Sequence, residues 1–338
     1  MHKSPFQKQL NNQVTQCLLC NHYCLIKDGQ TGICGARINK EGDIYSLVYG
    51  FPVAMNPDPI EKKPLFHFLP ASLTYSVGTF GCNFTCKNCQ NWDISQKKEL
   101  TDMDDMIDYV SPKKIVEEAI GHGCQSIAYT YNEPTIFAEY ALDIMEIAKQ
   151  NGLKNIWVSN GFMSEEALGR IMPLLDAVNV DLKSFDEEFY RNICGAKLPP
   201  ILENLKLLKV EQIHLEVTTL LIPKTSDDPE MLKNLAKFIN NELGSDTPWH
   251  LTLFSPESSH KMKSLPQTEK DSLFNAHEIG KEAGLDYVYI GNLPGTEREN
   301  TYCPKCGELA IRRLGYHIER LDNAGNCPAC DRSLDITG

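Results

Sequence analysis

The sequence lacks any apolar run of about 18 residues, the length that a membrane-spanning helix needs. Residues 1–7 also lack the apolar core of a secretory signal peptide. Basic residues are few: 33 Lys and Arg stand against 45 Asp and Glu, a formal net charge of −12. Phosphate backbones demand basic patches, so we expect neither a nucleic-acid binder nor an anionic-membrane binder. A local basic pocket for an anionic substrate remains compatible with this charge.

Internal repeats and low-complexity tracts are also missing. The 338 residues are 42% hydrophobic and 23% charged, which is ordinary for a globular protein. This length accommodates one barrel-sized domain with small appendages. Cysteine, by contrast, is abundant: thirteen residues, most of them in C-x2-C and C-x3-C groups. Without a secretion signal, such groups indicate metal ligation in a reducing compartment, which predicts a cytoplasmic protein.

The most informative group is Cys82, Cys86 and Cys89, spaced C-x3-C-x2-C in one short polar loop. The preceding segment 73–79 has the β-branched and aromatic content of a buried strand. Structural zinc takes four ligands, and [4Fe–4S] clusters are normally bound by four cysteines. Three close cysteines therefore predict a cluster with one iron open to a ligand. The competing interpretations are stray thiols or half of a zinc knuckle.

The region after residue 71 alternates short apolar runs with amphipathic segments. We predict strands at 73–79, 126–131, 155–159, 177–182, 214–222, 249–254 and 287–291. We predict helices at 112–121, 135–150, 164–172, 200–209, 229–243 and 267–283. This alternation predicts an α/β fold with a parallel sheet, in the form of a partial rather than a closed barrel.

The predicted domain organisation has three parts. Residues 1–70 form a cysteine-rich element that ends in a Pro-rich connector at 51–60, residues 71–295 form the barrel, and residues 296–338 form a second cysteine-rich element.

The central loop resembles the signature of the radical S-adenosylmethionine (radical SAM) superfamily. Its continuation, Gln-Asn-Trp-Asp-Ile-Ser-Gln at 90–96, is similar to the branch related to pyruvate formate-lyase activating enzyme, and within it to the AmmeMemoRadiSam-system radical SAM enzymes. The resemblance implies a (β/α)6-type partial TIM barrel and a [4Fe–4S] cluster on Cys82, Cys86 and Cys89. It also implies that the fourth iron chelates S-adenosylmethionine. A reduced cluster would then cleave this cofactor to methionine and a 5′-deoxyadenosyl radical, with electrons from a partner such as a flavodoxin or ferredoxin.

Polar residues follow several predicted strands, where barrels collect their reactive groups. Glu133 and Asn160 open the segments after the second and third strands, and Asp181 and Lys183 share one face of the fourth. These residues could simply be a helix start, a turn and an internal ion pair. The resemblance implies instead that Glu133 binds the methionine amino group, that Asn160 lies near the cofactor, that Asp181 binds the ribose hydroxyls and that Lys183 binds the methionine carboxylate.

Related sequences commonly carry a histidine after the sixth strand, and this chain has Ser255 there. We therefore keep three alternatives for assisting the cofactor carboxylate: Ser255 itself, His250 or His260. Cys124 is predicted to be a core residue. Cys194 is a minor candidate for the active face.

Two further cysteine groups each offer four ligands. Cys303, Cys306, Cys327 and Cys330 match a zinc ribbon, with a short hairpin turned by Gly315 between the pairs, and an iron–sulfur cluster is the alternative. The N-terminal group predicts either zinc or a second cluster, and its members are Cys17, Cys20, Cys24 and Cys34. His22 lies inside that group and is expected to point outward.

The leading functional prediction is a radical SAM oxidoreductase that abstracts hydrogen from an unidentified protein or small molecule. One version activates a partner protein by making a glycyl radical, as the branch resemblance implies. The alternative is radical modification of a small molecule or of another protein. A non-catalytic electron carrier or metal-dependent scaffold is the third possibility, although such a protein needs neither a large βα domain nor the Asp181/Lys183 pair.

Overall fold

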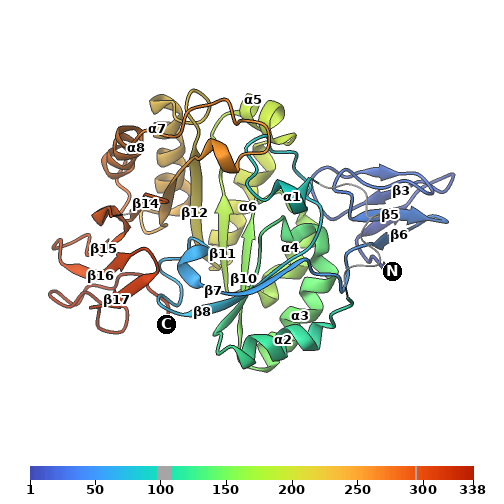
Figure 1. The fold of residues 1–338 in the computed structure, drawn as a ribbon, viewed down its shortest axis with the longest axis horizontal. Coiled ribbons are helices and arrows are strands. Elements are labelled where there is room, and N and C mark those ends of the chain that lie inside the picture. The colour runs from blue at the N-terminus through green and yellow to red at the C-terminus, as the bar shows by residue number, and fades with distance from the viewer. Residues whose placement is uncertain (97–107, 294) are drawn as a thin grey trace.

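The computed structural model describes residues 1–96, 108–293 and 295–338. Its centre is an eight-stranded sheet in the order β14-β13-β12-β11-β10-β9-β8-β7 (Figure 1). The strands are β7 (Ala54–Pro59), β8 (Leu73–Gly78), β9 (Ser126–Tyr129), β10 (Lys154–Ser159), β11 (Ala177–Asp181), β12 (His214–Leu221), β13 (Trp249–Leu253) and β14 (Val288–Gly291). Strands β8 to β14 are mutually parallel. The edge strands β7 and β14 do not pair with each other, so the sheet is an open partial barrel, as predicted.

All seven predicted strands are present, and the six predicted helical segments are helical at their centres. The α-helices are α1 (Trp92–Ser95), α2 (Pro112–Gly121), α3 (Ala138–Gln150), α4 (Glu165–Ile171), α5 (Glu187–Phe189), α6 (Pro199–Val210), α7 (Pro229–Phe238) and α8 (Lys270–Glu282). The 3-10 helices are η1 (Ile60–Lys62), η2 (Pro134–Phe137), η3 (Met172–Leu174), η6 (Pro256–Ser258) and η7 (Glu297–Glu299), and π-helical turns lie at η4 (Tyr190–Cys194) and η5 (Ile239–Leu243). The sequence patterns did not reveal α1, α5 or η4, because these elements are too short to show a helical period.

Local side-chain chemistry explains where several helices begin. Ser111 accepts a hydrogen bond from the backbone N–H of Lys114 and precedes a proline at the first position of α2. Ser164 and Asp228 cap α4 and α7 in the same way. Each cap satisfies a backbone N–H that the helix itself leaves unpaired. These residues therefore set where the helix following each strand starts.

The Pro-rich segment before the barrel is more than a connector. Its residues Ala54–Pro59 form β7, which pairs antiparallel with β8 along its whole length. Pro57 and Pro59 lie opposite Tyr75 and Leu73. A proline cannot donate a ladder hydrogen bond, but it is tolerated at a sheet edge, and β7 is the edge strand. Proline content alone therefore masked this strand.

The two cysteine-rich elements lie at opposite ends of the molecule (Figure 1). The N-terminal element contains two three-stranded sheets, β1-β6-β5 and β2-β3-β4. Their strands are β1 (His2–Lys3), β2 (Gln7–Gln9), β3 (Thr15–Cys17), β4 (Leu25–Ile26), β5 (Arg37–Lys40) and β6 (Asp43–Ser46). The C-terminal element contains β15 (Thr301–Tyr302), β16 (Leu309–Leu314) and β17 (His317–Arg320), and the last two form the predicted hairpin around Gly315.

A buried carboxylate joins the sheet to the segment that follows β7. Glu216, on β12, is fully buried and accepts hydrogen bonds from the backbone N–H groups of Phe66 and His67 at 2.9 and 2.8 Å. His214 and His250 contact the same carboxylate at 3.0 and 2.6 Å. Burial alone would raise the pKa of Glu216, but these hydrogen bonds lower it well below its usual range. The ionised carboxylate therefore fixes the polypeptide across this part of the sheet.

Within the described ranges, no helix is both long and apolar enough to cross a membrane.

Candidate active site

The loop with the three central cysteines lies at the carboxyl end of β8 and runs into α1. Cys86 is buried, and Cys82 and Cys89 are partly buried. The backbone N–H of Phe84 donates to the Cys82 sulfur at 3.4 Å, and the Cys89 sulfur lies 3.1 Å from the Ser95 hydroxyl oxygen on α1. The short helix therefore orients one cysteine, and the loop backbone orients another.

The spacing of these three sulfurs argues against a single metal ion. In the part of the chain that the structure describes, only the C-terminal cysteine group brings three or more ligand atoms within 4.8 Å of one another. At least one pair among Cys82, Cys86 and Cys89 is therefore farther apart than that. A cluster separates its cysteine ligands more widely than one ion does, because each thiolate binds a different iron. The donor set fits a [4Fe–4S] cluster.

Cys194 belongs to this site, which the sequence suggested only as a minor possibility. Its backbone carbonyl accepts from the N–H of Thr85 at 2.8 Å, and the carbonyl of Ile193 accepts from Lys87 at 3.0 Å. Its thiol is buried beside Cys86. Interaction with this thiol, together with the nearby Lys183 ammonium, lowers the pKa of Cys86 despite its burial. The π-helical turn η4 therefore holds the cysteine loop through backbone hydrogen bonds.

Asp181, the last residue of β11, and Lys183, two residues beyond it, pair on the same side of the chain, as their alternation predicts. The Lys183 ammonium donates to Asp181 Oδ2 at 2.9 Å, and Leu182 between them is fully buried. Burial lowers the pKa of Lys183, but the negative charges of Asp181 and of the thiolate forms of Cys86 and Cys194 raise it well above its usual value. The cation is thus positioned beside the cysteine loop. Asp181 keeps 40% of its side chain exposed, so it presents a second oxygen to any bound ligand.

Glu133 is buried at the start of η2, next to the cysteine loop. Its Oε1 accepts from the backbone N–H and hydroxyl of Thr135 and from the Ser159 hydroxyl, and its Oε2 accepts from the backbone N–H of Asn160 at 2.8 Å. Asn160 also donates its side-chain amide to Asn83 Oδ1, inside the loop, at 2.8 Å. Burial raises the pKa of Glu133 in spite of these donors. A cation beside Oε2 would stabilise the ionised form.

The three alternatives for assisting the cofactor carboxylate differ in position: His250 lies within β13, and Ser255 and His260 follow it. His250 is fully engaged with Glu216 at 2.6 Å and packs edge-on against Phe66, so it does not reach the cysteine loop. His260 donates its backbone N–H to the Cys89 carbonyl at 3.0 Å and stacks on Trp92. Ser255 is half-buried at the start of η6, and among the described residues its side chain makes no hydrogen bond. His260 therefore adjoins the site, whereas a role for Ser255 remains a prediction.

The C-terminal cysteine group has the geometry of a single tetrahedral metal ion. The sulfurs of Cys303 and Cys330 lie 3.7 Å apart, and those of Cys306 and Cys327 lie 3.5 Å apart. Four thiolates bound to zinc at about 2.3 Å lie about 3.8 Å from one another in a regular tetrahedron. The spacing favours zinc over an iron–sulfur cluster at this end of the chain.

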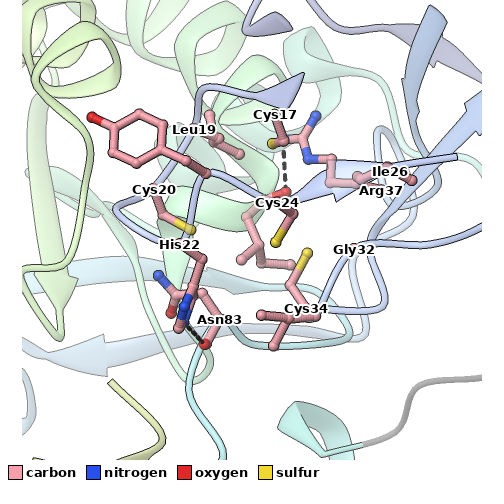
Figure 2. A pocket seen from close by; sticks show the side chains of 13 residues that line it. Cys17, Leu19, Cys20, His22, Cys24, Ile26, Gly32, Cys34, Arg37 and Asn83 are labelled. Atoms are coloured by element: carbon pink, nitrogen blue, oxygen red, sulfur yellow. Dashed lines mark hydrogen bonds between the residues drawn. The ribbon is translucent and has the colours of Figure 1, made fainter. Parts of the chain in front are cut away.

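The N-terminal cysteine group is arranged differently. Its four residues line one pocket with Leu19, Ile26 and Arg37 around them (Figure 2). His22 was expected to point outward, but its Nε2 lies 2.8 Å from the Asn83 carbonyl oxygen and its ring packs edge-on against Phe162. The expectation was wrong because the sequence could not show that the central cysteine loop packs against this element.

Gly81 marks the contact between the N-terminal element and the cysteine loop. It has φ +86°, and a Cβ there would lie 2.3 Å from the Cys34 carbonyl oxygen. We expect Gly81→Ala to lose about 2–4 kcal/mol of stability, from left-handed strain and from overpacking. Gly123→Ala is the matched control, because Gly123 has φ +70° with open space around it. Urea denaturation should show a clearly larger loss for Gly81→Ala; equal losses would contradict the close contact.

The site's architecture agrees with comparisons to known proteins. Residues 76–239 match the family profile of the Radical SAM superfamily. The chain is also 41% identical, over 341 residues and 99% of both chains, to the uncharacterized protein MJ0808 of Methanocaldococcus jannaschii. The chain belongs to the radical SAM superfamily. Radical SAM proteins use a [4Fe–4S] cluster and S-adenosylmethionine, and the donor set of the three-cysteine loop fits such a cluster.

Two other likenesses are weaker. The pyruvate formate-lyase 1-activating enzyme of Escherichia coli K12 is 24% identical over 195 residues, which cover 56% of this radical SAM chain and 77% of that enzyme. A radical SAM methyltransferase from Sphaerobacter thermophilus has a similar fold, with a TM-score of 0.51, 13% identity, and coverage of 72% of this chain and 71% of that one. The second likeness concerns the fold alone.

Proposed function

We propose that this radical SAM protein activates a partner protein by abstracting a hydrogen atom from one of its glycine residues. The observation that carries the enzymatic part is the largely buried Lys183 ammonium, 16% exposed, beside Cys86, with the partly exposed Asp181 next to it. A passive electron carrier has no use for a largely buried cation at its cluster, because removing a charge from water costs free energy. The similarity to an activating enzyme supports the choice of a glycyl radical as product.

The proposed cofactor contacts follow from the side chains around the loop. The cluster would bind S-adenosylmethionine at its open iron and would supply the electron for the reductive cleavage of this cofactor. Lys183 would bind the methionine carboxylate, and Asp181 would accept from the ribose hydroxyls. Glu133 would accept from the methionine ammonium through Oε2, which receives only one hydrogen bond from the described residues and has room for another. Asn160 would align Glu133 with the loop, because it contacts both.

Removing the lysine charge tests this arrangement. A hydrogen bond to a charged group contributes about 1.5–3 kcal/mol, so we expect Lys183→Met to weaken S-adenosylmethionine binding about tenfold to a hundredfold. Iron content should stay unchanged. Lys154→Met, which breaks another Lys–Asp pair at 2.9 Å, is the matched control and should leave binding unaffected. Equilibrium dialysis of both variants measures the difference; unchanged affinity in Lys183→Met would remove Lys183 from the cofactor site.

Two assays test the function itself. The reduced holoenzyme, incubated with S-adenosylmethionine, should produce 5′-deoxyadenosine, and its absence from fully loaded protein would refute the enzymatic reaction. Co-incubation with a glycyl-radical enzyme of the same organism should then give the EPR doublet of a glycyl radical. If 5′-deoxyadenosine forms but no candidate partner gains that doublet, the substrate is a small molecule or a different protein.

The electron source for the proposed reaction would be a flavodoxin or ferredoxin.

A further inference from the structure

The N-terminal cysteines surround a pocket that the reaction above does not use. Cys17 is buried, and Cys20, Cys24 and Cys34 are half-buried. Cys24 and Cys34 point toward one another across the pocket (Figure 2). Apolar side chains complete the walls of the pocket: Leu19, Ile26, Ile33 and Ile136. Four thiols around an apolar pocket are an arrangement that binds metal.

The separation of the four sulfurs distinguishes a cluster from a single ion. In the C-terminal group, two pairs of sulfur atoms lie 3.5 and 3.7 Å apart, which fits one zinc ion. Within the described residues, the N-terminal sulfurs form no set of three within 4.8 Å of one another. Four thiolates on one ion lie about 3.8 Å apart, so these thiols would have to move closer together to share a single ion. A cubane cluster accepts thiolates that lie farther apart, because each thiolate binds its own iron.

Two residues that line this pocket, Arg37 and Asn83, each have a buried N–H donor without an acceptor among the described residues. Arg37 is 1% exposed, and its terminal nitrogens bind Glu139 and the Ile136 carbonyl, but its Nε has no partner among the described residues. Asn83 is also 1% exposed, and its side-chain Nδ2 is likewise unpaired. A buried donor without an acceptor costs about 1–3 kcal/mol. Inorganic sulfide and thiolate sulfur are acceptors that such donors commonly meet around iron–sulfur clusters.

The pocket adjoins the catalytic loop directly. Asn83 lines the pocket and follows Cys82, whose thiol lies 3.8 Å from Asn83 Oδ1. The Cys34 carbonyl oxygen lies 2.3 Å from where Gly81, the residue before Cys82, would carry a Cβ. The residues on either side of Cys82, Gly81 and Asn83, thus lie against the N-terminal cysteine group. On its outer side the pocket is bordered by Tyr23 and Ile33, which are exposed.

We propose that Cys17, Cys20, Cys24 and Cys34 bind a second [4Fe–4S] cluster, which relays electrons to the cluster of the central loop. An external one-electron donor of the flavodoxin or ferredoxin class would reduce the N-terminal cluster from the 2+ to the 1+ state. That cluster would return to 2+ as the catalytic cluster becomes 1+. The electron count balances with one donor oxidised for each catalytic cluster reduced. The relay role depends on the proposed function, whereas the cluster site does not.

Iron analysis of anaerobically prepared protein tests the site. Wild type should contain about eight iron and eight sulfide per chain, and the triple variant Cys82→Ala/Cys86→Ala/Cys89→Ala should keep about four of each. That variant should also show the EPR signal of a reduced [4Fe–4S] cluster after dithionite treatment. Cys124→Ala, which removes a buried cysteine outside all three groups, is the control and should keep about eight iron. A triple variant without iron, or with two zinc ions per chain, would overturn the proposal.

The relay is tested on Cys24→Ala/Cys34→Ala. Reduction of its catalytic cluster by flavodoxin hydroquinone should be at least about tenfold slower than in wild type, while reduction by dithionite, a small molecule, should be unchanged. An unchanged rate with flavodoxin would leave the second cluster but refute its role as a relay. Neither measurement requires S-adenosylmethionine cleavage, so failure here and failure of the proposed function can be told apart.

Discussion

Replacing Cys86 by alanine should abolish 5′-deoxyadenosine formation. Cys86 is the buried member of the central group, and the Cys194 thiol and the Lys183 ammonium lower its pKa, which favours the thiolate. A three-cysteine site has no spare ligand, so losing one thiolate should remove the catalytic cluster. Product formation per chain, measured by chromatography after reduction, is expected to fall to the level without enzyme. The circular dichroism spectrum should persist, because the sheet and its helices do not depend on this sulfur.

Cys124→Ala provides the comparison for this result, since that cysteine is also buried but follows α2, outside the three groups. It should retain both iron and activity. Product formation by Cys86→Ala at wild-type rates, with the reductant present, would show that the central loop is not the catalytic cluster site.

Replacing Glu216 by glutamine should destabilise the fold by about 3–5 kcal/mol, the usual cost of removing one partner from a buried charged group. The neutral amide cannot accept all the hydrogen bonds from Phe66, His67, His214 and His250. Chemical denaturation of apoprotein at neutral pH measures the change. Glu203→Gln on α6 is the control, because that side chain is 73% exposed and should alter stability by no more than about 0.5 kcal/mol.

Lowering the pH should reduce the difference in the free energy of unfolding between wild type and Glu216→Gln. The pKa of Glu216 is lowered on folding, so the folded state binds fewer protons than the unfolded state. Its stabilising effect is fully present above the unfolded glutamate pKa of about 4.3 and is lost as the pH falls toward the lower folded value. The free energies of unfolding of wild type and Glu216→Gln, measured by denaturation from neutral pH to this acidic range, should therefore converge. Parallel curves would show that the carboxylate is not the ionised, hydrogen-bonded group that the fold indicates.

Much of the architecture follows from local pattern. The seven parallel strands could be predicted because each is a short apolar run bounded by turns, and the pattern depends only on neighbouring residues. Strand β7 escaped prediction, since Pro57 and Pro59 are acceptable only at a sheet edge, and being an edge is a tertiary property. His22 was wrongly expected to point outward, and Cys194 could be predicted only as a minor candidate for the active face. Their importance arises from the loop against which they pack, which is distant in the sequence.

The sequence by itself determined the number and spacing of the thiol ligands in the central loop, and these predict its chemistry. The spacing of Cys82, Cys86 and Cys89 leaves a metal cluster one ligand short, and that count needs no coordinates. The two outer groups have equal ligand counts, so only the tertiary structure distinguished them: one set of sulfurs closes to the size of a single ion, and the other encloses a pocket with unpaired N–H donors. The physical reason is that ligand identity is local, whereas the distances between ligands depend on how separated segments pack together.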